Sequence, residues 1–231
     1  KQKTAYEIYQ CDWSSDVCSS DLFPERAGAA NQFQGEGEHL EVVRGDGKAK
    51  LNLWETNFVP DLTGFKLYDL GERGKGSKNV SFVLADSTMH SHTSEIPVGR
   101  YKKAHRHAAG THVHAVSGEG YSLLWYEGDE KFVEIPWRHG IMYVPPFWMF
   151  HQHFNTCPDP ARYVACSMGS RRYPFISLRK RSAEGYGSLS IQQGGRQVEY
   201  EDQDPRIHRE WLEEMKKNGV TPKMDKFNVA Q

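Results

Sequence analysis

Short apolar runs separated by turn residues dominate the pattern of hydrophobic and polar positions along this chain. Each run is only a few residues long and is bounded by Gly, Pro, Asp or Glu. None follows the 3.6-residue period of a helix, so each run is predicted to be a β-strand. The predicted strands are 51–54, 65–68, 80–84, 122–126, 132–135, 141–144 and 163–167. Short strands at this spacing predict an antiparallel sandwich or barrel.

The last part of the chain has a different pattern, which predicts a helix at about 205–218. Asp204 is a suitable N-cap, and Pro205 suits the first helical position. Gly219 stands where a helix commonly ends. One apolar stripe recurs at every fourth residue, through Ile207, Trp211 and Met215. We expect this stripe to pack on the barrel or on a second subunit.

The first residues are set apart before any reasoning about the fold. Residues 12–22 resemble the conceptual translation of a sequencing-adapter oligonucleotide, which indicates an assembly scar from environmental DNA; the alternative is a Ser-rich flexible tail. Either way residues 1–22 are excluded. The remainder is predicted to comprise an N-terminal extension at 23–78 that packs on the barrel, the barrel at 79–178, and a C-terminal extension at 179–231.

Composition and charge exclude several classes of protein. The 231 residues carry 29 basic and 30 acidic side chains, which argues against a non-specific nucleic-acid binder. The chain has no uninterrupted apolar run of about 18 residues, which argues against a membrane span. Outside the excluded segment, with its Cys11 and Cys18, the cysteines are Cys157 and Cys166. They favour a cytoplasmic protein with free thiols, and a disulfide between them is the open alternative.

Histidines carry the chemical signal, because nine of the eleven lie between His90 and His153. His105 and His107 stand two residues apart, so on a strand both side chains point to the same face and can bind one metal ion. A His-x-His pair alone is weak support, since such pairs occur by chance on surface strands. The pair formed by His90 and His92 is a candidate for such chance.

The spacing around these histidines strengthens the prediction of a metal site. Two blocks resemble the paired motifs of the cupin family, G-x5-H-x-H-x3,4-E-x6-G and G-x5-P-x-G-x2-H-x3-N. Eight of the ten fixed positions agree: Gly99, His105, His107, Gly118, Gly140, Pro146, His151 and Asn155. The resemblance covers about 80–168. It implies an all-β fold, the cupin double-stranded β-helix or jelly-roll barrel, in which His105, His107 and His151 meet around a metal.

Two positions depart from the family motifs. Trp148 replaces the glycine of the second motif and could place an aromatic wall near the site. The glutamate of the first motif is absent: one spacing puts Thr111 at its position, and the longer spacing puts His112 there. Thr111 fits without a bulge, whereas the other alignment makes His112 a fourth ligand.

Three neutral ligands leave the charge of a divalent ion unbalanced and leave open coordination sites for substrate and dioxygen. This favours substrates that chelate as anions through two oxygens. A narrower resemblance links 104–107 and the Trp148-x-x-His151-x-His153-x-Asn155 segment to the gentisate 1,2-dioxygenase branch of cupins, which holds Fe(II) by three histidines. Those enzymes usually carry two barrels, so this resemblance supports oxygen chemistry better than gentisate itself. Mn, Zn, Ni and Cu are the alternative metals.

Further residues are candidates for contact with the substrate or support of the ligands. His153 could hydrogen-bond the substrate or simply pack, and Arg162 could bind a carboxylate or form a surface salt bridge. Arg106 is expected to point outward. The candidate set beyond the three ligands is Thr111, His112, His153, Trp148, Arg162 and Asn155.

These patterns support three hypotheses about function. The first is an Fe(II) dioxygenase that acts on a small aromatic or hydroxy-acid substrate. The second is an isomerase, lyase or decarboxylase that uses its metal as a Lewis acid. The third is a non-catalytic cupin that binds a small molecule. The expected partners are a small-molecule substrate, dioxygen and a second copy of the chain in a homodimer, with neither nucleic acid nor membrane.

Overall fold

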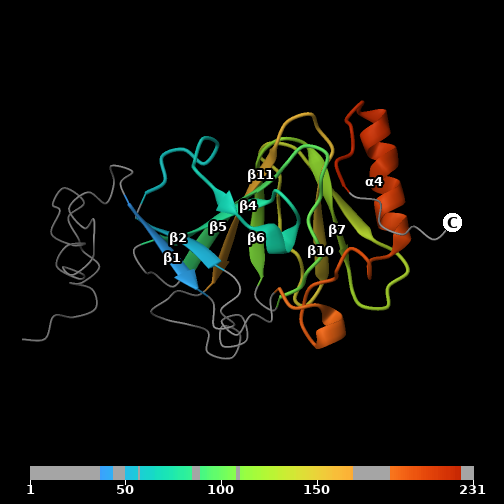
Figure 1. The fold of residues 1–231 in the computed structure, drawn as a ribbon, viewed down its shortest axis with the longest axis horizontal. Helices are drawn as coiled ribbons and strands as arrows, with labels where there is room; N and C mark the ends of the chain where they lie inside the picture. The colour runs from blue at the N-terminus through green and yellow to red at the C-terminus, as the bar shows by residue number, and fades with distance from the viewer. Residues whose placement is uncertain are drawn as a thin grey trace, which may run out of the picture.

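A computed structural model of the chain describes residues 37–43, 50–56, 58–84, 89–107, 110–168 and 188–224. Strands form most of it, and a helix lies at one end (Figure 1). The elements are β1 (Glu38–Val43), β2 (Lys50–Thr56), β3 (Tyr68–Asp69), η2 (Gly71–Arg73), β4 (Lys78–Leu84), β5 (Met89–Ile96), β6 (Thr111–Ser117), β7 (Gly120–Trp125), β8 (Val133–Trp137), β9 (Met142–Tyr143), β10 (Phe150–Asn155), β11 (Ala161–Met168), η3 (Ile191–Gln193) and α4 (Pro205–Lys217). Residues 12–22, including Cys18, and Cys11 lie outside the described residues.

The strand pairing is that of a jelly roll. One sheet contains the order β5-β11-β6-β9, and the other runs β10-β7-β8. Residues 100–107 lie along the free side of β10, through antiparallel bridges of Tyr101 with Phe154 and of His105 with His151. Eight segments therefore form two four-membered layers in which only the neighbours β7 and β8 are consecutive in sequence, which is the arrangement of a double-sheet jelly roll. The predicted all-β fold is confirmed.

The strands β1, β2 and β4 extend the first sheet beyond β5. The β2 and β4 strands pair in parallel, whereas β4 and β5 pair antiparallel. Of these, β2 matches the strand predicted at 51–54, and β1 and β2 lie at the opposite end of the molecule from α4 (Figure 1).

Apolar side chains fill part of the space between the two sheets. Ile96, Val113, Trp137, Tyr163 and Ala165 form one buried cluster there. They come from β5, β6, β8 and β11, so the cluster joins both layers. Because side chains alternate along a strand, the neighbours of these residues must face away from the interior.

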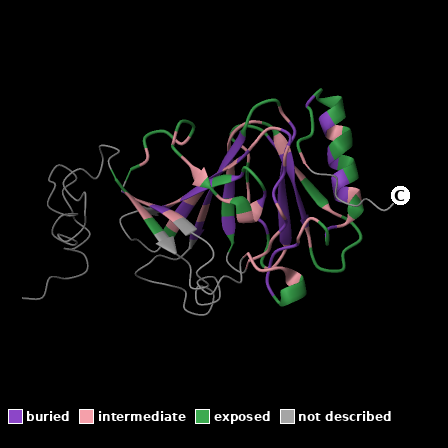
Figure 2. Cartoon of the chain, in the orientation of Figure 1, coloured by how far each residue is buried: buried purple, intermediate pink, exposed green. Residues whose placement is uncertain are grey.

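The helix α4 covers the outer face of the β10-β7-β8 sheet. Its buried residues Ile207, Trp211 and Met215 pack with Tyr101 and Phe154. The buried residues lie on the side of α4 that faces the barrel, and exposed residues lie on the other (Figure 2). The side chain of Asp204 caps the helix by accepting a hydrogen bond from the backbone N–H of Arg206. The predicted C-terminal helix is therefore confirmed, with its apolar stripe on the barrel.

The hydrophobic pattern does not predict four of the strands. It predicts segments of β2, β4, β7, β8, β9 and β11, but at 65–68 the structure has mostly loop, with β3 only at its end. The missed strands are β1, β5, β6 and β10. Two of these, β5 and β10, carry histidines on their interior face, so they lack the apolar alternation on which the prediction depends.

Arg162 holds the N-terminal extension on the barrel. Its guanidinium donates hydrogen bonds to the backbone oxygens of Leu62 at 2.7 Å and Phe65 at 3.1 Å, and pairs with the Glu95 carboxylate at 2.6 Å. Arg162→Met should lower the free energy of unfolding by about 3 kcal/mol, because it leaves a largely buried carboxylate without its main partner. Urea denaturation of the metal-free protein measures this change.

Lys78→Met is the matched control, because Lys78 contacts the same carboxylate only at 3.9 Å and is itself half exposed. We expect this variant to cost less than about 1 kcal/mol. Equal effects of the two substitutions would contradict the role assigned to Arg162.

The described residues include no helix with the length and apolar character needed to cross a membrane. Cys157 and Cys166 are both free thiols, so the alternative of a disulfide between them is wrong.

Candidate metal centre

The segment 100–107 and the strand β10 bring the motif histidines together. The backbone N–H of His105 donates to the oxygen of His151 at 3.1 Å, and the N–H of His151 donates back to the oxygen of His105 at 2.9 Å. A reciprocal pair of this kind fixes the two residues directly opposite each other. The register of these segments therefore places a first-motif histidine beside the second-motif histidine.

The side chains of His105, His107 and His151 converge, and we call them the three-histidine group. One ring nitrogen from each lies within 4.8 Å of those of the other two. The ring centroid of His151 is 4.3 Å from that of His105 and 4.7 Å from that of His107. The group contains no Asp, Glu or Cys, so all its potential ligand atoms are neutral imidazole nitrogens.

The environment of the group lowers the pKa of His105 and His151, which keeps these two imidazoles neutral. Burial, followed by the charge of Arg73, lowers the pKa of His105 well below its ordinary value. Burial, followed by the proximity of His107, lowers the pKa of His151 in the same way. Neutral imidazole is the form that binds a metal, so the site needs little proton release to accept an ion.

Two hydrogen-bonding details fit a metal at this position. The Nδ1 atom of His151 lies 3.2 Å from the backbone oxygen of Met149, and a hydrogen bond from Nδ1–H to that oxygen leaves Nε2 as the ligand atom. The Nδ1 atom of His105 is buried and has no hydrogen-bond partner among the described residues. Buried polar atoms normally have a partner, and a cation bound by the His105 ring would help to fix its orientation.

Histidines from both motifs thus meet beside a jelly-roll strand pair. The fold is a jelly-roll barrel of the kind that the cupin motifs imply. No family model and no curated protein matches the sequence. The chain is similar to solved structures of cupin proteins, at levels that leave the assignment resting on the strand pairing.

Three of these similar structures illustrate the level. Oxalate decarboxylase from Bacillus subtilis is 16% identical with a TM-score of 0.40, covering 48% of this chain and 29% of that chain. The Cnp3 cupin domain of Schizosaccharomyces pombe is 11% identical with a TM-score of 0.40, covering 64% and 94%. A recombinant oxalate oxidase in complex with glycolate is 17% identical with a TM-score of 0.39, covering 47% and 60%.

The motif glycines of the cupin barrel occupy left-handed backbone positions. Gly99 and Gly118 have φ of 77°, and Gly140 has φ of 84°. Trp148, at the position of the remaining motif glycine, keeps a φ of 60° despite its side chain. Such a conformation costs a non-glycine residue about 1–2 kcal/mol, so the surrounding contacts must hold it.

Those contacts place Trp148 between two arginines next to the three-histidine group. Its backbone N–H donates to the oxygen of His107 at 3.2 Å. Its ring centroid lies 4.9 Å from the guanidinium carbon of Arg196 and 5.7 Å from that of Arg106. Arg106 faces away from the group, as expected, and pairs with Glu127 at 2.9 Å. The aromatic side chain that the sequence suggested at this position therefore has a guanidinium group near its ring from both Arg106 and Arg196.

The structure distinguishes the two alignments of the missing glutamate. Thr111 is buried, and its hydroxyl lies 2.7 Å from the hydroxyl of Ser167. His112 is exposed on the opposite face of β6, where its ring stacks near that of His114. The alternation along the strand therefore puts Thr111 inside, and His112 is not a fourth member of the three-histidine group.

His153 lies beside the group without belonging to it. Its ring centroid is 5.5 Å from that of His151, and the side chain is buried. Its Nδ1 atom lies 2.7 Å from the Ser122 hydroxyl and 3.1 Å from the Tyr143 hydroxyl. Burial lowers the pKa of His153 well below its ordinary value, so this network fixes a neutral ring close to the candidate site.

Two other candidates have structural roles instead. Arg162 is turned from the interior because its neighbour Tyr163 faces inward, and its guanidinium is occupied by the N-terminal extension. These contacts favour the salt-bridge alternative for Arg162 over the binding of a substrate carboxylate. Asn155 donates to the backbone oxygens of Ile96 and Asp159, so it fixes the end of β10 and does not reach the site.

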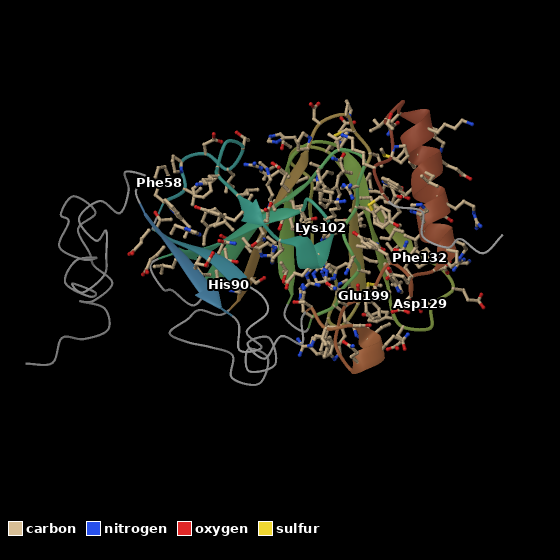
Figure 3. The ribbon with its side chains drawn as sticks, in the orientation of Figure 1. Phe58, His90, Lys102, Asp129, Phe132 and Glu199 are labelled. Atoms are coloured by element: carbon tan, nitrogen blue, oxygen red, sulfur yellow. The ribbon has the colours of Figure 1, made fainter. Side chains whose placement is uncertain are left out.

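Three basic residues near the three-histidine group were not predicted from the sequence. Lys102 is almost fully buried within the barrel (Figure 3). Arg73, from η2 in the N-terminal extension, acts electrostatically on both His105 and His151. His92, which seemed a chance surface pair with His90, packs its ring 6.0 Å from Tyr163, and burial lowers its pKa to about 3. Motif spacing gives no signal for any of them.

Proposed function

We propose that the protein is a metal-dependent enzyme whose divalent ion is held by the three-histidine group. The observation that carries this proposal is the convergence of three neutral ring nitrogens within 4.8 Å, with no carboxylate among them. Three neutral ligands leave the full charge of the ion for its remaining coordination sites. An anionic chelating substrate is therefore the natural partner of this site.

The reaction that best fits is oxygenation of a small aromatic or hydroxy-acid substrate with Fe(II). When bound, iron supplies coordination sites for substrate and dioxygen and exchanges electrons between them. The gentisate branch, which the sequence resembles, uses the same set of three histidines. That resemblance supports the chemical class and leaves the identity of the substrate to experiment.

The chain's own residues would position the substrate and limit access of water. His153 presents a fixed neutral ring because Ser122 and Tyr143 hold its Nδ1 atom. Trp148 and Arg196 provide a flat aromatic ring and a positive charge close to His107. An anionic aromatic acid matches this pair in both shape and charge.

Oxygen consumption by anaerobically iron-loaded protein tests the proposal. With gentisate, salicylate and hydroxynaphthoate as the panel, we expect substrate-dependent oxygen uptake with at least one compound, and none from zinc-loaded protein. Failure of all three, with iron shown to be bound, would contradict the dioxygenase. Stoichiometric zinc in the purified protein would favour the Lewis-acid hypothesis, and saturable binding without turnover would favour a binding protein.

A further inference from the structure

Lys102 is a buried ammonium group without an acidic partner. Only 2% of the residue is exposed. Its Nζ atom donates a hydrogen bond to the Tyr163 hydroxyl at 3.2 Å and lies 4.9 Å from the centre of the Tyr163 ring. No carboxylate in the described ranges lies within ion-pairing distance of it. A lysine is rarely buried in this way, because removing its charge from water is costly.

The charged groups near Lys102 do not offset its charge. Glu95 acts on it from a distance but is engaged by Arg162 at 2.6 Å and by Lys78 at 3.9 Å. Arg73 adds a second positive charge in the same region. Burial lowers the pKa of Lys102, and an anion beside the amine would oppose that shift.

Tyr163 connects Lys102 to the candidate metal centre. The Tyr163 ring centroid lies 4.9 Å from that of His153, which in turn lies 5.5 Å from that of His151. Lys102 also precedes His105 by only three residues on the same segment. A chain of side-chain contacts through Tyr163 and His153 therefore connects the amine of Lys102 to His151.

We infer that Lys102 and the Tyr163 hydroxyl form an anion-binding subsite, which takes a second carboxylate of a substrate chelated at the three-histidine group. This inference rests on the proposed function. The Tyr163 oxygen accepts a hydrogen bond from the ammonium group, so its own O–H is available to donate to a carboxylate oxygen. Two donors of this kind give the carboxylate charge-assisted hydrogen bonds at a site where it replaces a missing counter-ion.

Ligand binding to the manganese-loaded protein tests the subsite without turnover. The probes are salicylate, which chelates, and 4-hydroxyisophthalate, which adds a second carboxylate to the same chelating pair. By calorimetry we expect the wild-type protein to bind the diacid about 10- to 100-fold more tightly, as expected for one charge-assisted hydrogen-bonding site. Lys102→Met should remove this preference and leave the affinity for salicylate unchanged.

Lys103→Met is the matched control, because the neighbouring lysine pairs with Glu199 instead of entering the barrel. It should keep the preference for the diacid. Tyr163→Phe, which retains the packed ring, should reduce the preference for the diacid over salicylate about fivefold or more. This variant tests the subsite if Lys102→Met does not fold. Equal affinity of wild-type protein for both probes, or a preference that survives both substitutions, would overturn the inference.

Formate binding to the metal-free protein separates the subsite from the proposed function. Formate needs the Lys102 and Tyr163 donors and no metal. If the protein retains no metal but formate binding is lost in Lys102→Met, the proposed function fails and the subsite stands. If metal binds and neither formate nor the diacid responds to Lys102→Met, the subsite fails and the metal centre stands.

Discussion

Alanine in place of His105, His107 or His151 is expected to lower the affinity for a divalent metal by about 100-fold or more. Each substitution removes one of the three converging nitrogens and leaves two neutral ligands, which hold a hydrated ion poorly. Competition with a fluorescent chelator measures the affinity, and element analysis of the purified protein measures the content. Circular dichroism should show that the fold is retained.

His112→Ala is the control for this series, because His112 lies in the same barrel but is exposed on the outer face of β6. Its metal affinity should equal that of the wild-type protein. An equal loss in His112→Ala, or full metal content in all three ligand variants, would place the metal elsewhere.

Trp211→Ala is expected to lower the free energy of unfolding by about 4 kcal/mol. Trp211 has no exposed surface, packs edge-on against Tyr101 with ring centroids 4.9 Å apart, and donates its indole N–H to the backbone oxygen of Asn155 at 3.1 Å. The substitution leaves a large cavity under α4 and a buried carbonyl without its donor. Urea denaturation of the metal-free protein gives the change.

The adjacent residue provides the matched control for this prediction. Leu212 lies on the same helix with 36% of its surface exposed, so Leu212→Ala should cost less than about 1 kcal/mol. A similar small loss for Trp211→Ala would mean that α4 contributes little to the stability of the barrel.

The convergence of the three histidines was predictable because motif spacing reflects backbone geometry. Gly99, Gly118 and Gly140 each take a left-handed conformation at a turn, so their positions fix where the intervening strands begin and end. The histidines then fall at constant distances from these turns. This is why His105 and His151 could be paired from the sequence, although 45 residues separate them.

The polar interior of the barrel explains what the sequence could not reveal. Strand β10 carries His151 and His153 on its inner face, and β5 carries His92 there, so neither shows apolar alternation. The buried position of Lys102 could not be predicted for a related reason. The segment 100–107 bridges β10 only at Tyr101 and His105, and its irregular backbone places both Lys102 and His105 inside, although they stand three positions apart.

The role of Arg162 could not be predicted from the sequence, because it depends on contacts with distant residues. An arginine near the second motif is compatible with a substrate-binding role or a structural one, and only the facing of Tyr163 decides between them. The backbone oxygens of Leu62 and Phe65, which Arg162 binds, lie about 100 residues away in the sequence. Tertiary contacts of that range leave no local pattern in the chain.

X-ray absorption spectroscopy of the protein as purified, at the edges of iron, manganese, zinc, nickel and copper, addresses the metal centre most directly. The structure predicts one ion per chain with three imidazole nitrogens at about 2.0–2.2 Å and the remaining positions filled by oxygen. A protein free of metal that also binds none on addition of Fe(II), Mn(II) or Zn(II), or an ion ligated by sulfur or carboxylates alone, would contradict it.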